Sequence, residues 1–225
     1  MKKNYTMVFA TVTALIALCA FWGCSSSDDD DGPSLPQAEE ASLGNVQITV
    51  ADGVQVYKAD GTTPYTFTPG PAKQVTTYNH VSGSYAAAVA ALSSIDANGK
   101  LTLKLPVVTD WTGFDSNGFQ DDGLAADPFD VKTVEIRTLV FSVSSDNFEL
   151  DNINTTNGDT LRYIYADKDA RISGVEDDGD TVDLILKQGW NAVIKIRGKN
   201  GTGSGGALVT GKHGSGYRWV ASDDD

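Results

Sequence analysis

The residues best placed to do chemistry lie between positions 106 and 130, a stretch without regular apolar spacing. Oxygen-bearing side chains crowd there, among them Asp115, Asn117, Asp121 and Asp122. Calcium binds clustered carboxylate and amide oxygens on loops, which makes these four the candidate ligands of a structural Ca²⁺. Their spacing does not follow the EF-hand pattern, and acidic loops are commonly only solvated. We therefore expect no cofactor, with a structural calcium ion as the alternative.

Three aromatic residues share that stretch: Trp111, Phe114 and Phe119. Aromatic rings beside acids can stack on a sugar ring, which would make this a carbohydrate-binding loop. The other interpretation is that the rings fold inward and cover an end of the domain, and this is the one we favour.

Two histidines, His80 and His213, are the candidate ligands of a haem iron or another metal. Each is followed or preceded by residues typical of exposed loops. No GxSxG elbow is present to place a nucleophilic serine beside either of them. We expect the protein not to be an enzyme, and a haem or metal scavenger is an alternative function.

Residues 201–206 fit the GxGxxG pattern of dinucleotide-binding loops. That pattern needs a following helix, whereas Tyr217 to Val220 has the composition of a strand, so we expect a hairpin tip. The formal net charge is −13, and it becomes −15 once Lys2 and Lys3 are removed with the signal segment. Such an acidic chain repels nucleic acid, and we expect no nucleic-acid partner.

The N-terminus has the features of a secretory signal. Lys2 and Lys3 precede an apolar stretch from about Met7 to Phe21, which is followed by Gly23 and Cys24. The apolar stretch is shorter than the roughly 20 residues that a membrane-spanning helix needs. The four residues 21–24 resemble the processing site of bacterial lipoprotein precursors, which implies that Cys24 carries the lipid. Residue 22 is Trp, where that family usually has a small residue.

Acidic residues follow the cysteine directly: Ser27, Asp28, Asp29, Asp30 and Asp31. This run resembles the surface-export signal of Bacteroidota lipoproteins. The resemblance implies a protein held in the outer membrane by its lipid and facing the cell exterior. The membrane is then a partner through the anchor, and a glycan or another protein at the cell surface would be the second partner.

Short runs of alternating apolar and polar residues recur along the rest of the chain, as expected for half-buried strands. Eight Asn-Gly or Asp-Gly pairs, the strongest hairpin signal, separate them; they begin at Asp52, Asp60, Asn98, Asn117, Asp122, Asn157, Asp178 and Asn200. This pattern predicts an all-β protein, either an antiparallel β-sandwich or a partly open barrel. The predicted parts are a signal peptide at 1–23, a lipidated cysteine and flexible acidic tether at 24–43, one all-β domain at 44–222, and an acidic tail at 223–225.

Three local predictions depend on competing signals. Asp52-Gly53 is predicted to be a turn between two strands. Tyr85 to Ile95 is rich in alanine, but it ends before Asn98-Gly99, so we predict a strand in preference to a helix. The apolar parity changes near Arg137-Thr138, which predicts a bulge or a strand buried on both faces.

The C-terminal third contains Tyr163 to Asp169 and the run Leu186-Lys187-Gln188-Gly189-Trp190-Asn191. These residues resemble a short LKxGWN motif in uncharacterised surface lipoproteins of Bacteroidota and spirochaetes. The resemblance implies a turn between two strands and brings no activity with it. The function we expect is a surface-anchored lipoprotein that is a non-catalytic binding or structural component of the cell surface. The alternative is a glycan-binding accessory protein of a nutrient-uptake system.

Overall fold

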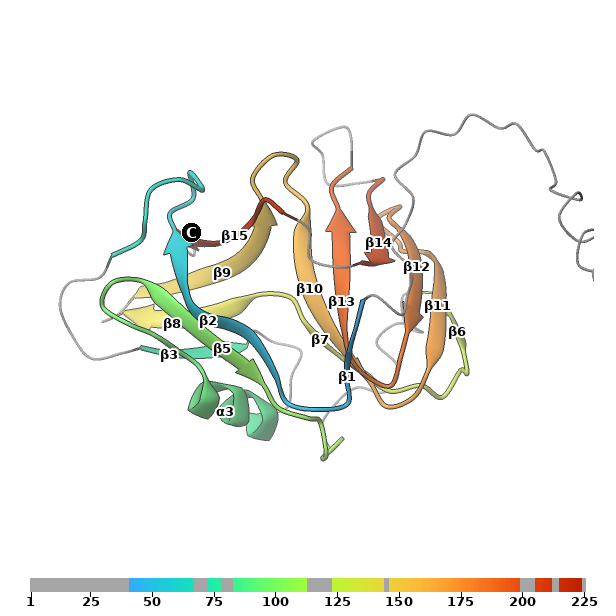
Figure 1. Ribbon diagram of the computed structural model, residues 1–225. Helices are drawn as coiled ribbons and strands as arrows, with labels where there is room; N and C mark the ends of the chain where they lie inside the picture. The colour runs from blue at the N-terminus through green and yellow to red at the C-terminus, as the bar shows by residue number, and fades with distance from the viewer. Residues whose placement is uncertain are drawn as a thin grey trace, which may run out of the picture. The chain divides into compact units, whose positions relative to one another are not determined.

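The computed structural model describes residues 41–66, 73–77, 83–112, 123–143, 146–198, 205–211 and 215–223 (Figure 1). The described residues contain one helix, α3 (Gly83–Leu92). The strands are β1 (Ser42–Gly44), β2 (Ile48–Tyr57), β3 (Lys73–Thr77), β4 (Ser94–Ile95), β5 (Lys100–Leu105), β6 (Ala125–Asp127), β7 (Thr133–Ile136), β8 (Leu139–Val143), β9 (Asp146–Asn154), β10 (Thr160–Ala166), β11 (Ala170–Val175), β12 (Thr181–Leu186), β13 (Gly189–Ile196), β14 (Ala207–Thr210) and β15 (Tyr217–Asp223).

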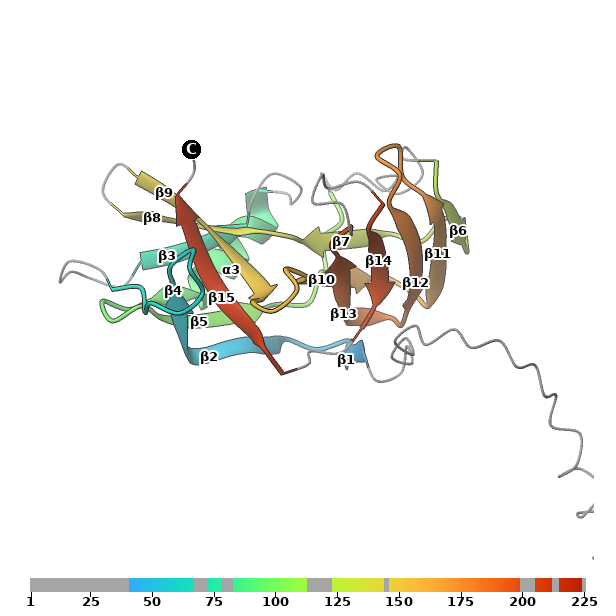
Figure 2. The same cartoon turned by 90° about the horizontal axis from the view of Figure 1, so that it is seen from above.

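All of these strands join one sheet of 15 strands, with the main order β15-β2-β5-β4-β3-β8-β9-β10-β13-β14-β12-β11-β6. The β15–β2 and β12–β14 pairs are parallel and the other pairs are antiparallel. Figure 2 shows β15 running beside both β9 and β2, so seven strands form a ring of neighbours. The sheet continues beyond this ring and ends at β6, so it is open as a whole and is not a barrel. The prediction was an all-β protein with antiparallel strands. Its mostly β and largely antiparallel character is confirmed, whereas the alternative of a partly open barrel was wrong.

Two apolar cores lie against opposite faces of β10 and β13. Leu161, Tyr163 and Tyr165 of β10 belong to the first core, whereas Ile164 and Ala166 belong to the second. Alternate side chains of a strand point to opposite faces, so the alternation of β10 supplies both cores. The first core is completed by β2, β4, β5, β7, β8, β9, β15 and α3, and the second by β11, β12 and β14.

Left-handed glycines confirm most of the predicted Asx-Gly turns. Gly61, Gly99, Gly123, Gly158 and Gly179 all have positive φ angles. The pairs at Asn117 and Asn200 lie outside the described residues. The prediction at Asp52 was wrong, because Gly53 (φ +63°) lies inside β2. There the β2–β5 register shifts between Thr49 and Val54, so the pair forms a bulge and the strand continues.

The prediction of a strand over Tyr85–Ile95 was wrong for most of its length. The chain forms α3 up to Leu92, and only Ser94–Ile95 form a strand. The helix places Tyr85 and Val89 in the first core, and alanine is the strongest helix former. The predicted hairpin is nevertheless present, since β4 pairs with β5 across a turn held by Asp96, whose carboxylate accepts the Asn98 and Lys100 amides at 2.8 and 2.9 Å.

The change of apolar parity near Arg137 has a different cause from the predicted one. The strand ends at Ile136 and a new strand begins at Leu139. β7 pairs with β10, whereas β8 pairs with β3 and β9, so the chain changes partners at this break. The change of partners replaces the predicted bulge or doubly buried strand.

The sheet extends past both ends of the predicted domain, 44–222. β1 begins at Ser42, within the range predicted as tether, and β15 extends to Asp223, the first residue of the predicted tail. Ala41 is completely buried. Among the described residues, no helix is long and apolar enough to cross a membrane.

Candidate functional site

Of the predicted ligand-contacting residues, the structure describes Trp111. This residue follows the segment that leaves β5 at Pro106, and its side chain is partly buried against the first core. The Trp111 ring lies 6.0 Å from the Tyr165 ring, centroid to centroid, at an interplanar angle of 49°. Trp111 therefore extends an aromatic group in the core, in line with the inward-folded interpretation, and keeps part of its surface in solvent.

The aromatic group behind Trp111 consists of Tyr85, Tyr165 and Trp190. Tyr165 and Trp190 meet edge to face at 5.2 Å. The Tyr85 hydroxyl and the Trp190 indole N–H both donate to the Pro106 carbonyl, at 2.9 and 3.2 Å. Because α3, β10 and β13 each contribute one ring, the group fixes the start of the loop that carries Trp111.

The phenols of this group remain protonated at neutral pH. Burial, followed by the nearby Tyr165, raises the pKa of Tyr85. Burial, followed by the Asp167 carboxylate, raises the pKa of Tyr165, whose hydroxyl donates to Asn45 Oδ1. Both groups are therefore hydrogen-bond donors that hold the fold, and neither is a base.

The other predicted site residues lie outside the described residues. They are Phe114 and Phe119; Asp115, Asn117, Asp121 and Asp122; His80 and His213; and the anchor residues Cys24 and Ser27 to Asp31. The sugar-binding, calcium, haem and lipidation predictions that rest on them stay predictions.

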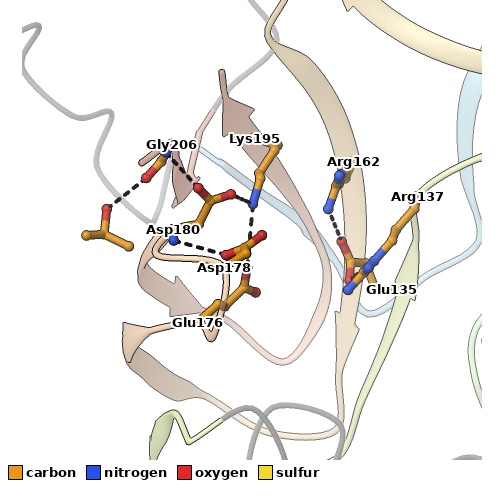
Figure 3. A network of polar contacts seen from close by, with 9 residues as sticks. Glu135, Arg137, Arg162, Glu176, Asp178, Asp180, Lys195 and Gly206 are labelled. Carbon is orange, nitrogen blue, oxygen red and sulfur yellow. Dashed lines mark hydrogen bonds and ion pairs between the residues drawn. The ribbon is translucent and has the colours of Figure 1, made fainter. Parts of the chain in front are cut away.

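The described residues contain one acidic cluster that the sequence interpretation missed. Glu176, Asp178 and Asp180 lie on the hairpin between β11 and β12, and each offers a carboxylate oxygen within 4.8 Å of the others (Figure 3). Such a group of oxygens could hold a metal ion. The signal in the sequence is the alternation of acids over 176, 178 and 180, which resembles an ordinary acidic hairpin tip.

Lys195 of β13 supplies the positive charge of this cluster. Its ammonium group forms ion pairs with Asp180 Oδ2 and, at 3.5 Å, with Glu176 Oε2. Asp180 is 1% exposed, and its other oxygen accepts the Gly206 N–H at 2.7 Å. A metal ion would have to displace the ammonium group, so we interpret the cluster as an internal ion pair that joins the hairpin to β13 and to the start of β14.

The environment of Asp180 favours its charged form. Burial is the largest single influence and opposes ionisation, but the Lys195 ammonium and the Gly206 N–H together outweigh it. The pKa of Asp180 is consequently held below its usual range. The glycine-rich segment that matched a phosphate-binding pattern thus directs one of its amides, that of Gly206, at a carboxylate of the chain itself.

A second charged group surrounds Glu135 of β7 (Figure 3). Its two carboxylate oxygens accept from Arg137 Nε at 2.7 Å and Arg162 Nη1 at 3.1 Å. Nearby, the Thr138 hydroxyl donates to Asp151 at 3.0 Å, and burial raises the pKa of that carboxyl. These contacts lie at the break between β7 and β8 and on the neighbouring strands β9 and β10, so they stabilise the change of partners there.

The LKxGWN residues form a structural turn, which we call the GWN corner (residues 187–191 with Gly44 and Asn45). Asn191 is completely buried; its amide accepts the Lys187 N–H at 2.9 Å and donates to the Lys187 and Gly189 carbonyls. Gly189 has a φ of +102°, and a Cβ there would overlap the Gly44 carbonyl. The corner therefore joins β12, β13 and β1, and the Gly and Asn of the motif have structural roles in it.

The described residues thus offer three features of possible functional interest: the first core with Trp111 at its margin, and the two charged groups. Comparisons of the chain with protein-family models, with curated proteins and with solved structures gave no match.

Proposed function

We propose that the protein is a surface-exposed lipoprotein, held in the outer membrane through Cys24, and that its β domain is a non-catalytic binding or structural component of the cell surface. The observation that carries this proposal is the order of the N-terminal features. An apolar signal segment, Gly23-Cys24 and the run Ser27 to Asp31 precede the first described strand, which begins at Ser42. In addition, the carboxylates of both charged groups in Figure 3 are engaged by cationic side chains or backbone amides of the chain itself.

We further infer that the sheet folds over to form the two packed layers of a β-sandwich. The support is the pair of cores on opposite faces of β10 and β13, because burial of both faces of a strand requires a layer on each side.

Lipidation is tested by feeding cells that make the full-length protein a labelled fatty acid. We expect label on the wild-type chain and on Cys19→Ser, and none on Cys24→Ser. Label that persists in Cys24→Ser would overturn the proposed anchor. Surface exposure is tested separately by adding a protease to intact cells. The protease should cleave the wild-type protein on intact cells. Replacement of Asp28 to Asp31 by asparagine should leave the protein on the inner side of the outer membrane and so protect it from the protease.

A second candidate function is glycan binding, favoured by the partly exposed ring of Trp111 beside Tyr165. A soluble oligosaccharide at 100 times its dissociation constant should stabilise the fold by about 2.7 kcal/mol, which a thermal-shift screen detects readily. Binding that is lost in Trp111→Ala, in a variant that still unfolds cooperatively, would support this function. Binding retained by that variant would place the glycan elsewhere, and a screen without any response would count against the function.

A further inference from the structure

Hydrogen bonds join the loops beside the GWN corner into one end of the sheet, which we call the GWN end (residues 43–46, 128–132, 167–169 and 187–189). The Asp167 N–H donates to the Lys132 carbonyl at 3.0 Å, and the Lys132 N–H donates to Asp167 Oδ1 at 2.9 Å. The Gln188 N–H in turn donates to Asp169 Oδ1 at 2.8 Å. These loops, together with residues 43–46, whose Gly44 pairs with Trp190, therefore lie at the same end of the sheet although they are far apart in the sequence.

Three exposed apolar side chains belong to the loops of this end. Phe129 is 76% exposed, the highest value for a large apolar side chain among the described residues. Val46 and Leu43, on the segment from β1 to β2, are 59% and 39% exposed. Aromatic and branched apolar side chains at the tip of an acidic protein are costly to expose to water and are suited to the interface of a lipid bilayer.

The charge of the GWN end differs from that of the chain as a whole. Its loops carry three lysines and three aspartates: Lys132, Lys168, Lys187, Asp130, Asp167 and Asp169. The formal charges of these six residues therefore sum to zero. Two ion pairs, Lys168–Asp130 at 2.9 Å and Lys187–Asp169 at 3.2 Å, hold four of them in contact. The other end of β11 leads into Glu176, Asp177 and Asp178. Anionic head groups repel that acidic tip and not the neutral GWN end.

The tether before β1 joins the sheet at a place that would let the GWN end face a membrane. Ser42 of β1 pairs with Asn191, so the tether joins the sheet beside the GWN corner. The 17 residues between Cys24 and Ser42 reach at most about 60 Å, which keeps the body close to a membrane that holds the lipid. We propose that the GWN end faces the bilayer and that the side chains of Phe129 and Val46 enter the interfacial layer. This inference rests on the proposed lipid anchor.

The test uses the absence of other thiols. After processing, the full-length chain has one cysteine, Cys24, whose sulfur carries the lipid. Phe129→Cys, Val46→Cys and, as a matched control, Val175→Cys at the other end of β11 (59% exposed in the wild type) can each be labelled with an environment-sensitive fluorophore. The acylated proteins are reconstituted in vesicles of three parts phosphatidylethanolamine to one part phosphatidylglycerol. Thermal unfolding confirms that each variant is folded.

We expect blue-shifted emission and quenching by nitroxide-labelled lipid at positions 129 and 46, and quenching by aqueous iodide at position 175. Water-like emission at both 129 and 46 in protein that floats with the vesicles overturns the orientation and leaves the anchor intact. Failure of the wild-type protein to acquire a lipid or to float overturns the anchor itself. Lipid contact at position 175 instead would show the reverse orientation and also overturn the proposal.

Discussion

At the scale of single residues, Asp180 shows how much of this structure depends on one buried charge. Its carboxylate joins Lys195 of β13 and the amide of Gly206, two segments that are far from it in sequence. Asp180→Asn keeps the shape and the acceptor for Gly206 but removes the charge facing Lys195. We expect a loss of roughly 3 kcal/mol in the free energy of unfolding, measured with urea.

The matched control is Asp183→Asn, which removes the exposed Arg171–Asp183 pair, whose side chains are 62% and 43% exposed. Exposed pairs contribute less than about 1 kcal/mol. Equal losses in the two variants would contradict the special role of Asp180.

The same residue gives a pH dependence with a defined sign. The pKa of Asp180 is lower in the folded protein than in the unfolded chain, where it is about 3.9. Its ionised form therefore stabilises the fold fully above about pH 4, and this contribution is lost as the pH falls through the lower folded pKa. Urea midpoints measured from pH 6 to pH 2 should fall more steeply in wild type than in Asp180→Asn. Parallel curves would show that other carboxyls account for the acid sensitivity.

Asn191 is a buried neutral residue on whose side chain the fold depends, as it does on the charged side chain of Asp180. Asn191→Leu preserves volume but leaves the Lys187 N–H and the carbonyls of Lys187 and Gly189 without their side-chain partner. Each buried polar group left unsatisfied costs about 1–3 kcal/mol, so we expect a loss of roughly 3 kcal/mol or more by urea unfolding. Gln188→Leu, in the same turn but exposed, should cost much less.

At the scale of elements, the GWN corner makes β1 part of the fold. Gly189→Ala would force a left-handed φ on alanine and drive its Cβ into the Gly44 carbonyl, so β1 must separate from β13. The control is Gly53→Ala, which has a φ of +63° but open space around the added carbon. The control should lose about 1 kcal/mol and Gly189→Ala clearly more, with faster hydrogen exchange in β1. Similar losses and unchanged exchange would show that the corner does not hold β1.

Elements also show where sequence reasoning succeeds and where it stops. Asn98-Gly99 predicts its hairpin correctly because the turn chemistry is local. Asp52-Gly53 has the same chemistry, yet the pairing of β2 with β5 continues past it, and the left-handed glycine becomes a bulge. Before Asn98, only Ser94 and Ile95 form the strand of the hairpin. The alanine-rich residues up to Leu92 form a helix, because alanine favours helix.

For the site residues too, the residue types can be identified in the sequence, whereas their contacts depend on long-range pairing. The acids at 176, 178 and 180 are plain in the sequence, but their meaning comes from Lys195, which the β13–β14 and β12–β14 pairings bring beside them. Trp111 could be identified as an aromatic at the margin of a loop, whereas its packing on Tyr165 depends on a strand some fifty residues later. Long-range pairing is the information that a pattern of residue types does not contain.

At the scale of the whole molecule, the dominant property is the net charge of −13. Self-repulsion in an acidic chain destabilises the compact state, and salt screens it, so the melting temperature should rise with sodium chloride. This general effect provides the background against which calcium binding can be recognised. A specific site would add stabilisation by calcium beyond that of magnesium at equal ionic strength.

Calcium in fact has two candidate locations, the predicted loop ligands at Asp115 to Asp122 and the acidic cluster with Lys195. Because an ammonium already lies among the cluster's carboxylates, we expect any calcium-specific shift to vanish in Asp121→Asn and to persist in Asp178→Asn. Thermal shifts of the two variants in calcium, magnesium and sodium chloride decide the matter. The reverse result would mean that calcium displaces Lys195, and equal shifts in all three salts would mean that only screening acts on the molecule.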